Sequence, residues 1–102
     1  MKTHNKLVRD LIPEIIAGSG KTPYTHILTE EAYLSALDQK LLEETHEYLS
    51  EPCMEELADM LEVMEAICRA RGYDMQAFMA LKAQKKSARG GFDQRIYLEY
   101  VD

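Results

Sequence analysis

The spacing of apolar residues predicts helices over most of the chain. The stretch "RDLIPEIIAGSGKTP" indicates a short helix that ends at the glycines and serine of residues 18–20. The stretch "EEAYLSALDQKLLEETHEYL" predicts a long helix with Thr29 as its N-cap. Two glutamates follow Thr29 and would lie in the first turn, where the positive end of the helix dipole favours them.

Two further helices are expected after the interruption "SEP" at residues 50–52. Ser50 is predicted to cap the first of them, with Pro52 in its first turn and Gly72 at its end. Asp74 is predicted to cap the second, which "GG" at positions 90 and 91 would end. Because the chain has no repeat, low-complexity segment or linker, we expect residues 1–102 to form a single helical domain.

Two segments have the composition of β-strands. "YTHILT" and "FDQRIYLEYV" carry β-branched and aromatic residues, and predict a minor two-stranded element of residues 24–29 and 94–101. The predicted fold class is therefore all-α, with a possible minor β element. A chain of 102 residues buries little surface by itself, so wide apolar helix faces indicate a helical bundle completed by oligomerisation.

Acidic residues interrupt the apolar face of the long helix. At about 100° per residue, the apolar side chains that share one broad face are Tyr33, Leu34, Leu37, Leu41, Tyr48 and Leu49. Glu44 falls inside this face and Glu47 lies at its edge, whereas Glu43 points further away. The following helix repeats the pattern, because Glu56 and Asp59 project on its apolar side.

The inward acids have i, i+3 spacing on two consecutive helices, so each pair lies on one face, a turn apart. If the helices pack antiparallel across the turn at Pro52, four carboxylates converge. Their desolvation would cost several kcal/mol per ion, so a cation must be present or their pKa values must rise. Hard oxygen donors without cysteine or histidine favour Mg²⁺ or Mn²⁺. The alternative is that these acids lie at the rim of a helical hairpin and pair with lysine or arginine.

Cations gather near the end of the last predicted helix. The sector that holds apolar side chains in its first half holds Lys82, Lys85, Lys86 and Arg89 in its second. Such a stripe would suit an anionic ligand beside the core, or it would simply complement the helix dipole. Lys6 and Arg9, in "NKLVRD", are weaker candidates for the same role, and surface charge is the alternative for both.

The net charge of −6 argues against general binding to nucleic acid or anionic membranes, because a polyanion requires a surplus of lysine and arginine. Cys53 and Cys68 form no CxxC pair, so neither a zinc site nor a disulfide framework is indicated. Charged residues interrupt the N-terminal apolar stretch, and no apolar run approaches the roughly 20 residues that span a bilayer. We therefore expect a cytoplasmic protein with reduced thiols.

The acid pattern resembles the signature of the all-α nucleoside triphosphate pyrophosphohydrolases, the MazG-like superfamily. It reads "EETHE" at residues 43–47 and "ELAD" at 56–59, which matches EExxE followed by ExxD. The segments "NKLVRDLIPEII", "EELADMLEVMEAI" and "KKSARGGFDQRI" resemble its phosphoribosyl-ATP pyrophosphohydrolase-like branch, so the resemblance covers nearly the whole chain. One departure is that only eight residues separate Glu47 from Glu56, fewer than in many MazG-type domains, which narrows the room for a base.

The resemblance implies Mg²⁺-dependent hydrolysis of a nucleoside triphosphate, canonical or non-canonical, to the monophosphate and pyrophosphate in a housekeeping role. The implied metal ligands are Glu44, Glu47, Glu56 and Asp59. Glu43 is the candidate catalytic residue, as a partner of the attacking water or of a metal ligand. The candidate phosphate-binding residues are Lys82, Lys85, Arg89, Lys6 and Arg9. The family is typically dimeric or tetrameric, which implies a homodimer or homotetramer here.

Two other functions fit the same residues. The first is the phosphoribosyl-ATP reaction of histidine biosynthesis, which shares the chemistry but not the substrate, and no residue of the sequence is specific for it. The second is a non-enzymatic helical dimer that binds a nucleotide or a protein, with purely structural acids.

Overall fold

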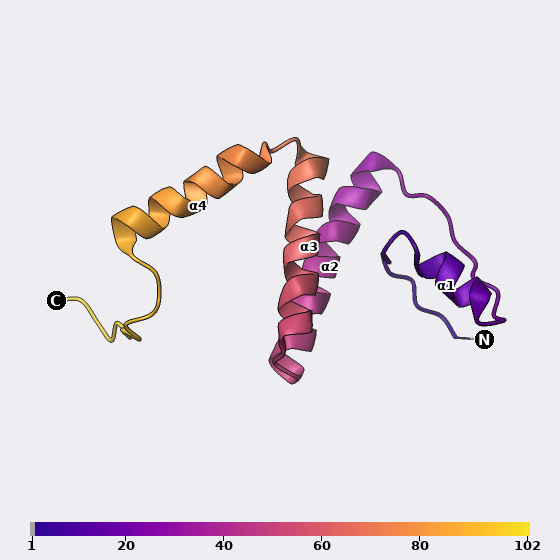
Figure 1. Cartoon of the computed structure of the whole chain (residues 1–102), viewed down its shortest axis with the longest axis horizontal. Coiled ribbons are helices and arrows are strands. Elements are labelled where there is room, and N and C mark those ends of the chain that lie inside the picture. The colour runs from indigo at the N-terminus through magenta and orange to yellow at the C-terminus, as the bar shows by residue number, and fades with distance from the viewer. Residues whose placement is uncertain (1) are drawn as a thin grey trace.

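The computed structural model describes residues 2–102. The regular secondary structure in this part of the chain is helical. Four helices follow one another in the order shown in Figure 1: α1 (Ile12–Gly18), α2 (Glu30–Ser50), α3 (Met54–Arg71) and α4 (Met75–Arg89). The predicted all-α class is therefore confirmed. None of these helices combines the length and the apolar character that crossing a membrane requires.

Helices α2 and α3 form an antiparallel hairpin that contains the core. Three residues connect them, and their axes run side by side in Figure 1. The apolar residues buried between them are Leu37, Val63 and Cys68. Glu44 is buried among them, so the seam between the two helices contains a carboxylate as well as apolar side chains.

Most of the predicted helix ends are confirmed by the cap geometry. The hydroxyl of Thr29 accepts a hydrogen bond from the Ala32 amide at 3.3 Å, and the carboxylate of Asp74 accepts one from the Ala77 amide at 3.0 Å. Gly72 ends α3 in the left-handed conformation, with φ of 77°, which a residue without a Cβ adopts at little cost. The local sequence therefore determines where these helices begin and end.

The predicted start of α3 is wrong. Ser50 is the last residue of α2 rather than a cap, and Cys53 occupies the N-cap position of α3 without a side-chain hydrogen bond. Pro52 consequently lies before the helix instead of in its first turn. A proline disfavours helical backbone in the residue before it, and Glu51 has left the helix with φ of −143° and ψ of 84°, so the connection begins one residue later than predicted.

The predicted two-stranded element is also wrong, because residues 24–29 and 94–101 form no strand. The two segments lie on opposite sides of the hairpin, one beside α1 and the other beyond α4 (Figure 1). Both are open to solvent, and Ile27 is 95% exposed. A short β-like segment needs a partner strand to supply its backbone hydrogen bonds, and neither segment has the other within reach.

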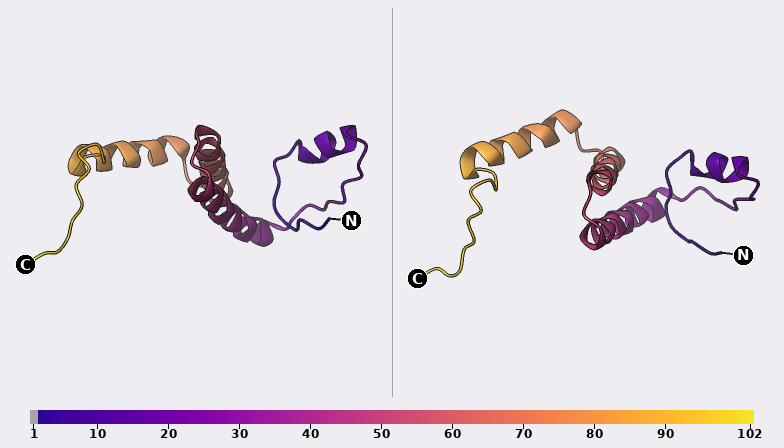
Figure 2. Two further views of the ribbon diagram at one scale, coloured as in Figure 1. Left: turned by 90° about the horizontal axis from the view of Figure 1, so that it is seen from below. Right: turned by 60° about the horizontal axis from the view of Figure 1, so that its bottom comes forward.

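The single chain is extended. Its radius of gyration is 17.9 Å, whereas a compact chain of this length would have one of about 13 Å. Helix α4 leaves α3 at the turn near Gly72 and projects away from the hairpin, as both views of Figure 2 show. Large apolar side chains of α4 and the C-terminal segment are therefore exposed, among them Leu81 at 52% and Phe92 at 96%.

Candidate metal centre

Five carboxylates from α2 and α3 gather where the hairpin faces the N-terminal segment. We call this set the acid cluster: Glu43, Glu44, Glu47, Glu56 and Asp59. One oxygen each from Glu43, Glu44 and Glu47 lie within 4.8 Å of one another, as do one oxygen each from Glu44, Glu56 and Asp59. Glu44 belongs to both groups. The antiparallel hairpin thus brings together the inward acids that the helical pattern identified.

Burial distinguishes Glu44 from an ordinary surface acid. Its residue is only 6% exposed. One carboxylate oxygen, Oε1, lies 3.4 Å from the ammonium of Lys40, and the other, Oε2, is buried without a hydrogen-bond partner among residues 2–102. The Oε2 atom of the half-buried Glu56 is in the same condition. An unsatisfied buried oxygen is costly, and Glu44 and Glu56 each have an oxygen within 4.8 Å of the other, so the pair indicates a place for a cation.

The proton affinities of these two acids reflect the same crowding. Desolvation raises the pKa of Glu56 to about 7, and the neighbouring carboxylates of Glu47, Glu44 and Asp59 contribute in the same direction. Desolvation also raises the pKa of Glu44, aided by Glu47 and Asp59 and opposed by Lys40. The positive charges near the cluster are therefore too few to hold the pKa values of Glu44 and Glu56 at their usual level.

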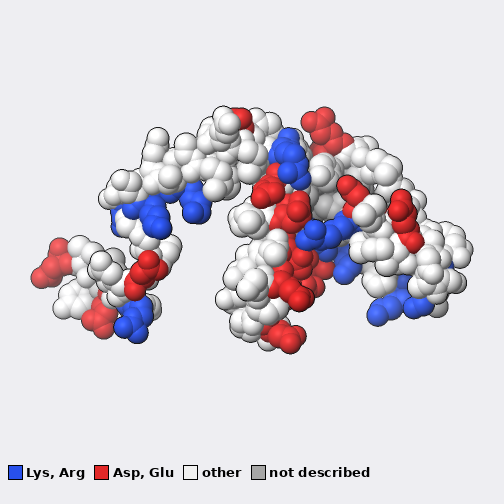
Figure 3. Space-filling view, in the orientation of Figure 1, with Lys and Arg blue, Asp and Glu red and all other residues white. Residues whose placement is uncertain are grey.

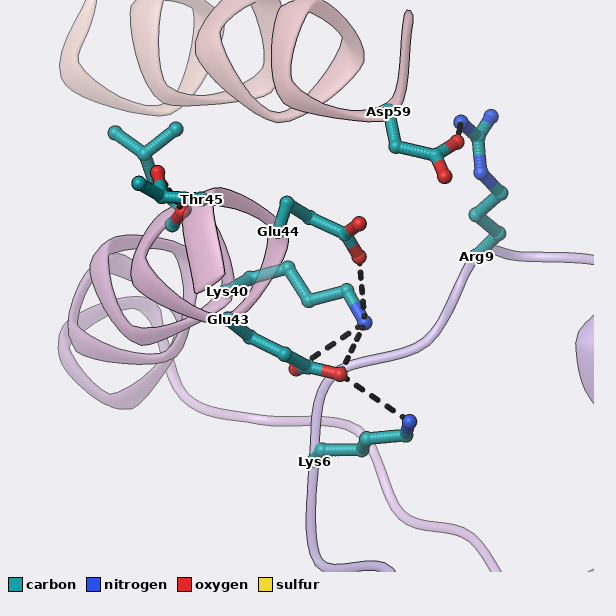
Figure 4. A network of polar contacts seen from close by, with 8 residues as sticks. Lys6, Arg9, Lys40, Glu43, Glu44, Thr45 and Asp59 are labelled. Atoms are coloured by element: carbon teal, nitrogen blue, oxygen red, sulfur yellow. Dashed lines mark hydrogen bonds and ion pairs between the residues drawn. The ribbon is translucent and has the colours of Figure 1, made fainter. Parts of the chain in front are cut away.

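Glu43 is in a different environment. Its carboxylate lies 3.2 Å from the ammonium of Lys6 and 3.4 Å from that of Lys40 (Figure 4). Partial burial acts to raise the pKa of Glu43, but the two lysines outweigh it and lower the pKa. Glu43 is therefore ionised at neutral pH, and it lies at the edge of the cluster rather than pointing away into solvent.

Two of the predicted phosphate-binding residues lie directly on the acid cluster. Lys6 contacts Glu43, and the guanidinium of Arg9 donates a hydrogen bond to Asp59 at 2.7 Å. Figure 4 shows both side chains reaching the acids from the same N-terminal segment. A cavity of about 340 Å³ opens beside them, lined by Arg9, Glu44 and Asp59 among others.

Lys40 is a site residue that the sequence-based interpretation did not single out. It is three and four positions before Glu43 and Glu44 and forms ion pairs with both. The signal was present in the sequence, because oppositely charged residues at i, i+3 and i, i+4 on a helix are neighbours. Lys40 partly neutralises the α2 side of the cluster, whereas Glu56 on α3 forms no ion pair with any residue between 2 and 102.

The cations of α4 do not reach the acid cluster within one chain. Lys82, Lys85, Lys86 and Arg89 are exposed and form no ion pair with other residues of the 2–102 region. Figure 3 shows the lysine and arginine side chains of α4 separated by open space from the acids of the hairpin. Of the predicted phosphate-binding residues, the fold therefore brings only the two from the N-terminal segment to the acids.

Comparison with known proteins finds a similar sequence for a short part of the chain. A stretch of 42 residues is 52% identical to an uncharacterized protein of Mycolicibacterium smegmatis, and it covers 41% of this chain and 43% of that protein. The chain matches no protein-family model. No solved structure matches it either.

The donor set of the acid cluster fits a hard divalent cation. The candidate ligands are carboxylate oxygens, and neither cysteine nor histidine belongs to either group. Oxygen ligands of this kind suit Mg²⁺ and Mn²⁺. The two orphaned oxygens of Glu44 and Glu56 are the positions where such an ion would relieve the largest desolvation cost.

Proposed function

We propose that the protein is a Mg²⁺-dependent nucleotide pyrophosphohydrolase, which hydrolyses a nucleoside triphosphate to the monophosphate and pyrophosphate in a housekeeping role. The observation that carries the proposal is the convergence of carboxylates from α2 and α3. Glu44 and Glu56 each have a buried oxygen without a hydrogen-bond partner in the described part of the chain. The resemblance of the acid pattern to the MazG-like superfamily supports the same activity, and membership of that superfamily is part of the proposal.

In this proposal Glu44, Glu47, Glu56 and Asp59 hold Mg²⁺, with Mn²⁺ as a substitute. When bound, the ion would coordinate phosphate oxygens and stabilise the negative charge that develops on them in the reaction. Its charge also explains how a protein with a net charge of −6 would bind a polyanion, because a divalent ion reverses the local charge of an acidic site.

Glu43 has a separate role in the proposal. Its carboxylate is ionised because Lys6 and Lys40 lower its pKa, so it is an acceptor that orients the attacking water. In the reaction the water oxygen forms a bond to phosphorus and the anhydride bond between the α- and β-phosphates breaks. The pyrophosphate leaves, and the proton of the water passes to a nearby base or to solvent.

A second copy of the chain is the proposed partner. The extended single chain exposes apolar residues on α3 and α4, and a chain of this size would bury them by forming a homodimer or homotetramer. Such an assembly also makes the cations of α4, including Lys82, Lys85 and Arg89, available to the acid cluster of a neighbouring copy. The free thiols of Cys53 and Cys68 suit a cytoplasmic location.

The test is release of pyrophosphate from a panel of canonical and non-canonical nucleoside triphosphates with Mg²⁺. Glu56→Gln removes a proposed ligand and is expected to abolish release, whereas Glu55→Gln changes an exposed neighbour outside the acid cluster and should leave it intact. If the wild type cleaves no nucleotide, the enzymatic proposal fails. If Glu56→Gln retains full activity, the assigned metal centre fails.

A further inference from the structure

The N-terminal arm, residues 5–10, lies across the acid cluster and places two cations on it. Lys6 Nζ is 3.2 Å from Glu43 Oε1, and Arg9 Nη2 is 2.7 Å from Asp59 Oδ1. One of these acids is a proposed metal ligand and the other adjoins the ligands. The positive charges of the arm therefore contact carboxylates that a divalent cation at this site would also need.

The backbone of the arm is held while its charged ends stay accessible. Leu7 and Val8 are half-buried and line the cavity beside the cluster. Leu7 and Val8 hold the arm against the hairpin, and the hydrogen bond of 3.0 Å from the Ile12 amide to the Arg9 carbonyl is a local turn that continues the arm into α1. In contrast, the side chains of Lys6 and Arg9 are 42% and 56% exposed. Ion pairs as exposed as these contribute little to stability and are easily exchanged for another partner.

We propose that the arm is a displaceable cationic cap, whose Arg9 and Lys6 neutralise the acids in the absence of metal and bind phosphate oxygens when metal is present. The inference rests on the proposed function and specifies how the same site handles charge. Arg9 is the main element, because a guanidinium can donate two parallel hydrogen bonds to a phosphate as well as to a carboxylate. The half-buried Leu7 and Val8 would keep Arg9 beside the cavity if Asp59 bound a metal ion.

The proposal predicts opposite effects on two ligands. Arg9→Gln removes a competitor for Asp59, so the metal alone should bind more tightly. It also removes a phosphate donor, so pyrophosphate should bind less tightly in the presence of metal. A purely structural arm would change both affinities in the same direction, because misplaced acids would bind metal less well and the metal-dependent anion less well too.

The experiment is calorimetric titration of the full chain with Mn²⁺, followed by titration with pyrophosphate at saturating Mn²⁺. For Arg9→Gln we expect a Mn²⁺ affinity about two- to fivefold higher and a pyrophosphate affinity about tenfold lower than in the wild type. The matched control is Arg71→Gln, which breaks the exposed Arg71–Asp38 pair of 3.1 Å outside the acid cluster and should change neither.

Each other result is decisive against the inference. If Arg9→Gln weakens both ligands, or leaves either affinity unchanged, the exchange is overturned while a metal site that binds Mn²⁺ in the wild type remains. If Arg71→Gln reproduces the effects of Arg9→Gln, they reflect net charge rather than the arm, and the inference is again overturned. If the wild type binds no Mn²⁺, both the inference and the proposed function fail.

Discussion

The guanidinium of Arg9 lies 2.7 Å from the carboxylate of Asp59, across a sequence separation of 50 residues. This contact joins the N-terminal arm to α3 at the point where α3 faces the buried Glu44 of α2. It shows that the acid cluster is partly neutralised from outside the hairpin, although Oε2 of Glu44 has no hydrogen-bond partner within residues 2–102.

Glu44→Gln should stabilise the metal-free protein. The substitution keeps the size of the side chain and removes a negative charge that is almost entirely buried. Relief of an unsatisfied charged oxygen is worth roughly 1–3 kcal/mol, so we expect the free energy of unfolding in urea with EDTA to rise by about 1 kcal/mol or more. Glu55→Gln, on the exposed side of α3, should change it by less than about 0.5 kcal/mol. A loss of stability in Glu44→Gln would show that its charge is satisfied in the folded protein.

The metal-free protein should become less stable as pH rises from about 4.5 to about 7. The pKa of Glu56 is raised from 4.5 to about 7 by desolvation and by the neighbouring Glu47, Glu44 and Asp59, so in this window the folded state binds more protons than the unfolded state. Stability that is fully present below pH 4.5 is then lost as pH rises through 7. Urea unfolding at a series of pH values measures this.

Glu56→Gln provides the control for the pH dependence, because it removes the titrating group. Its stability should fall much less over the same pH window. A slope equal to that of the wild type would assign the pH dependence to other groups and count against the crowding at Glu56.

Leu37→Ala should cost about 2–5 kcal/mol of stability. Leu37 is only 3% exposed and is one of few apolar residues buried between α2 and α3, so the hairpin has little else to compensate for the cavity. We expect a greatly lowered urea midpoint. A cost below about 1 kcal/mol would mean that packing outside this seam determines the stability of the chain.

The protein should self-associate through the exposed apolar residues. Met79 on α4 is 51% exposed in the single chain, and Met79→Glu would place a charge in the proposed interface. Sedimentation analysis of the wild type should give a dimer or tetramer, and Met79→Glu should shift it toward the monomer. Gln76→Glu, on the same helix, tests whether added charge alone has this effect. A wild type that stays monomeric at all concentrations would contradict the proposed assembly.

Local sequence determined the helices and the burial of one acid. Thr29, Asp74 and Gly72 act at short range, so their cap roles follow from the residues around them. The burial of Glu44 was also predictable, because the periodicity of one helix is enough to place a residue on its apolar face.

Contacts between segments that are distant in the sequence could not be predicted from local patterns. The Arg9–Asp59 pair depends on the path of the arm across the hairpin, which no local pattern specifies. The strand pairing failed for the same reason, since residues 24–29 have a β-like composition but no partner nearby. Ser50 was misassigned because a serine two residues before a proline suits either a helix end or a cap, and α2 continues through Ser50, one residue further than predicted.

The central claim is that the acid cluster binds a divalent cation, and thermal unfolding with Mg²⁺ at constant ionic strength tests it most directly. A ligand at 100 times its dissociation constant adds about 2.7 kcal/mol of stability, so the melting temperature of the wild type should rise by several degrees. Glu56→Gln should lose most of this rise, and NaCl at the same ionic strength should not reproduce it. An equal rise with NaCl, or an undiminished rise in Glu56→Gln, would contradict the claim.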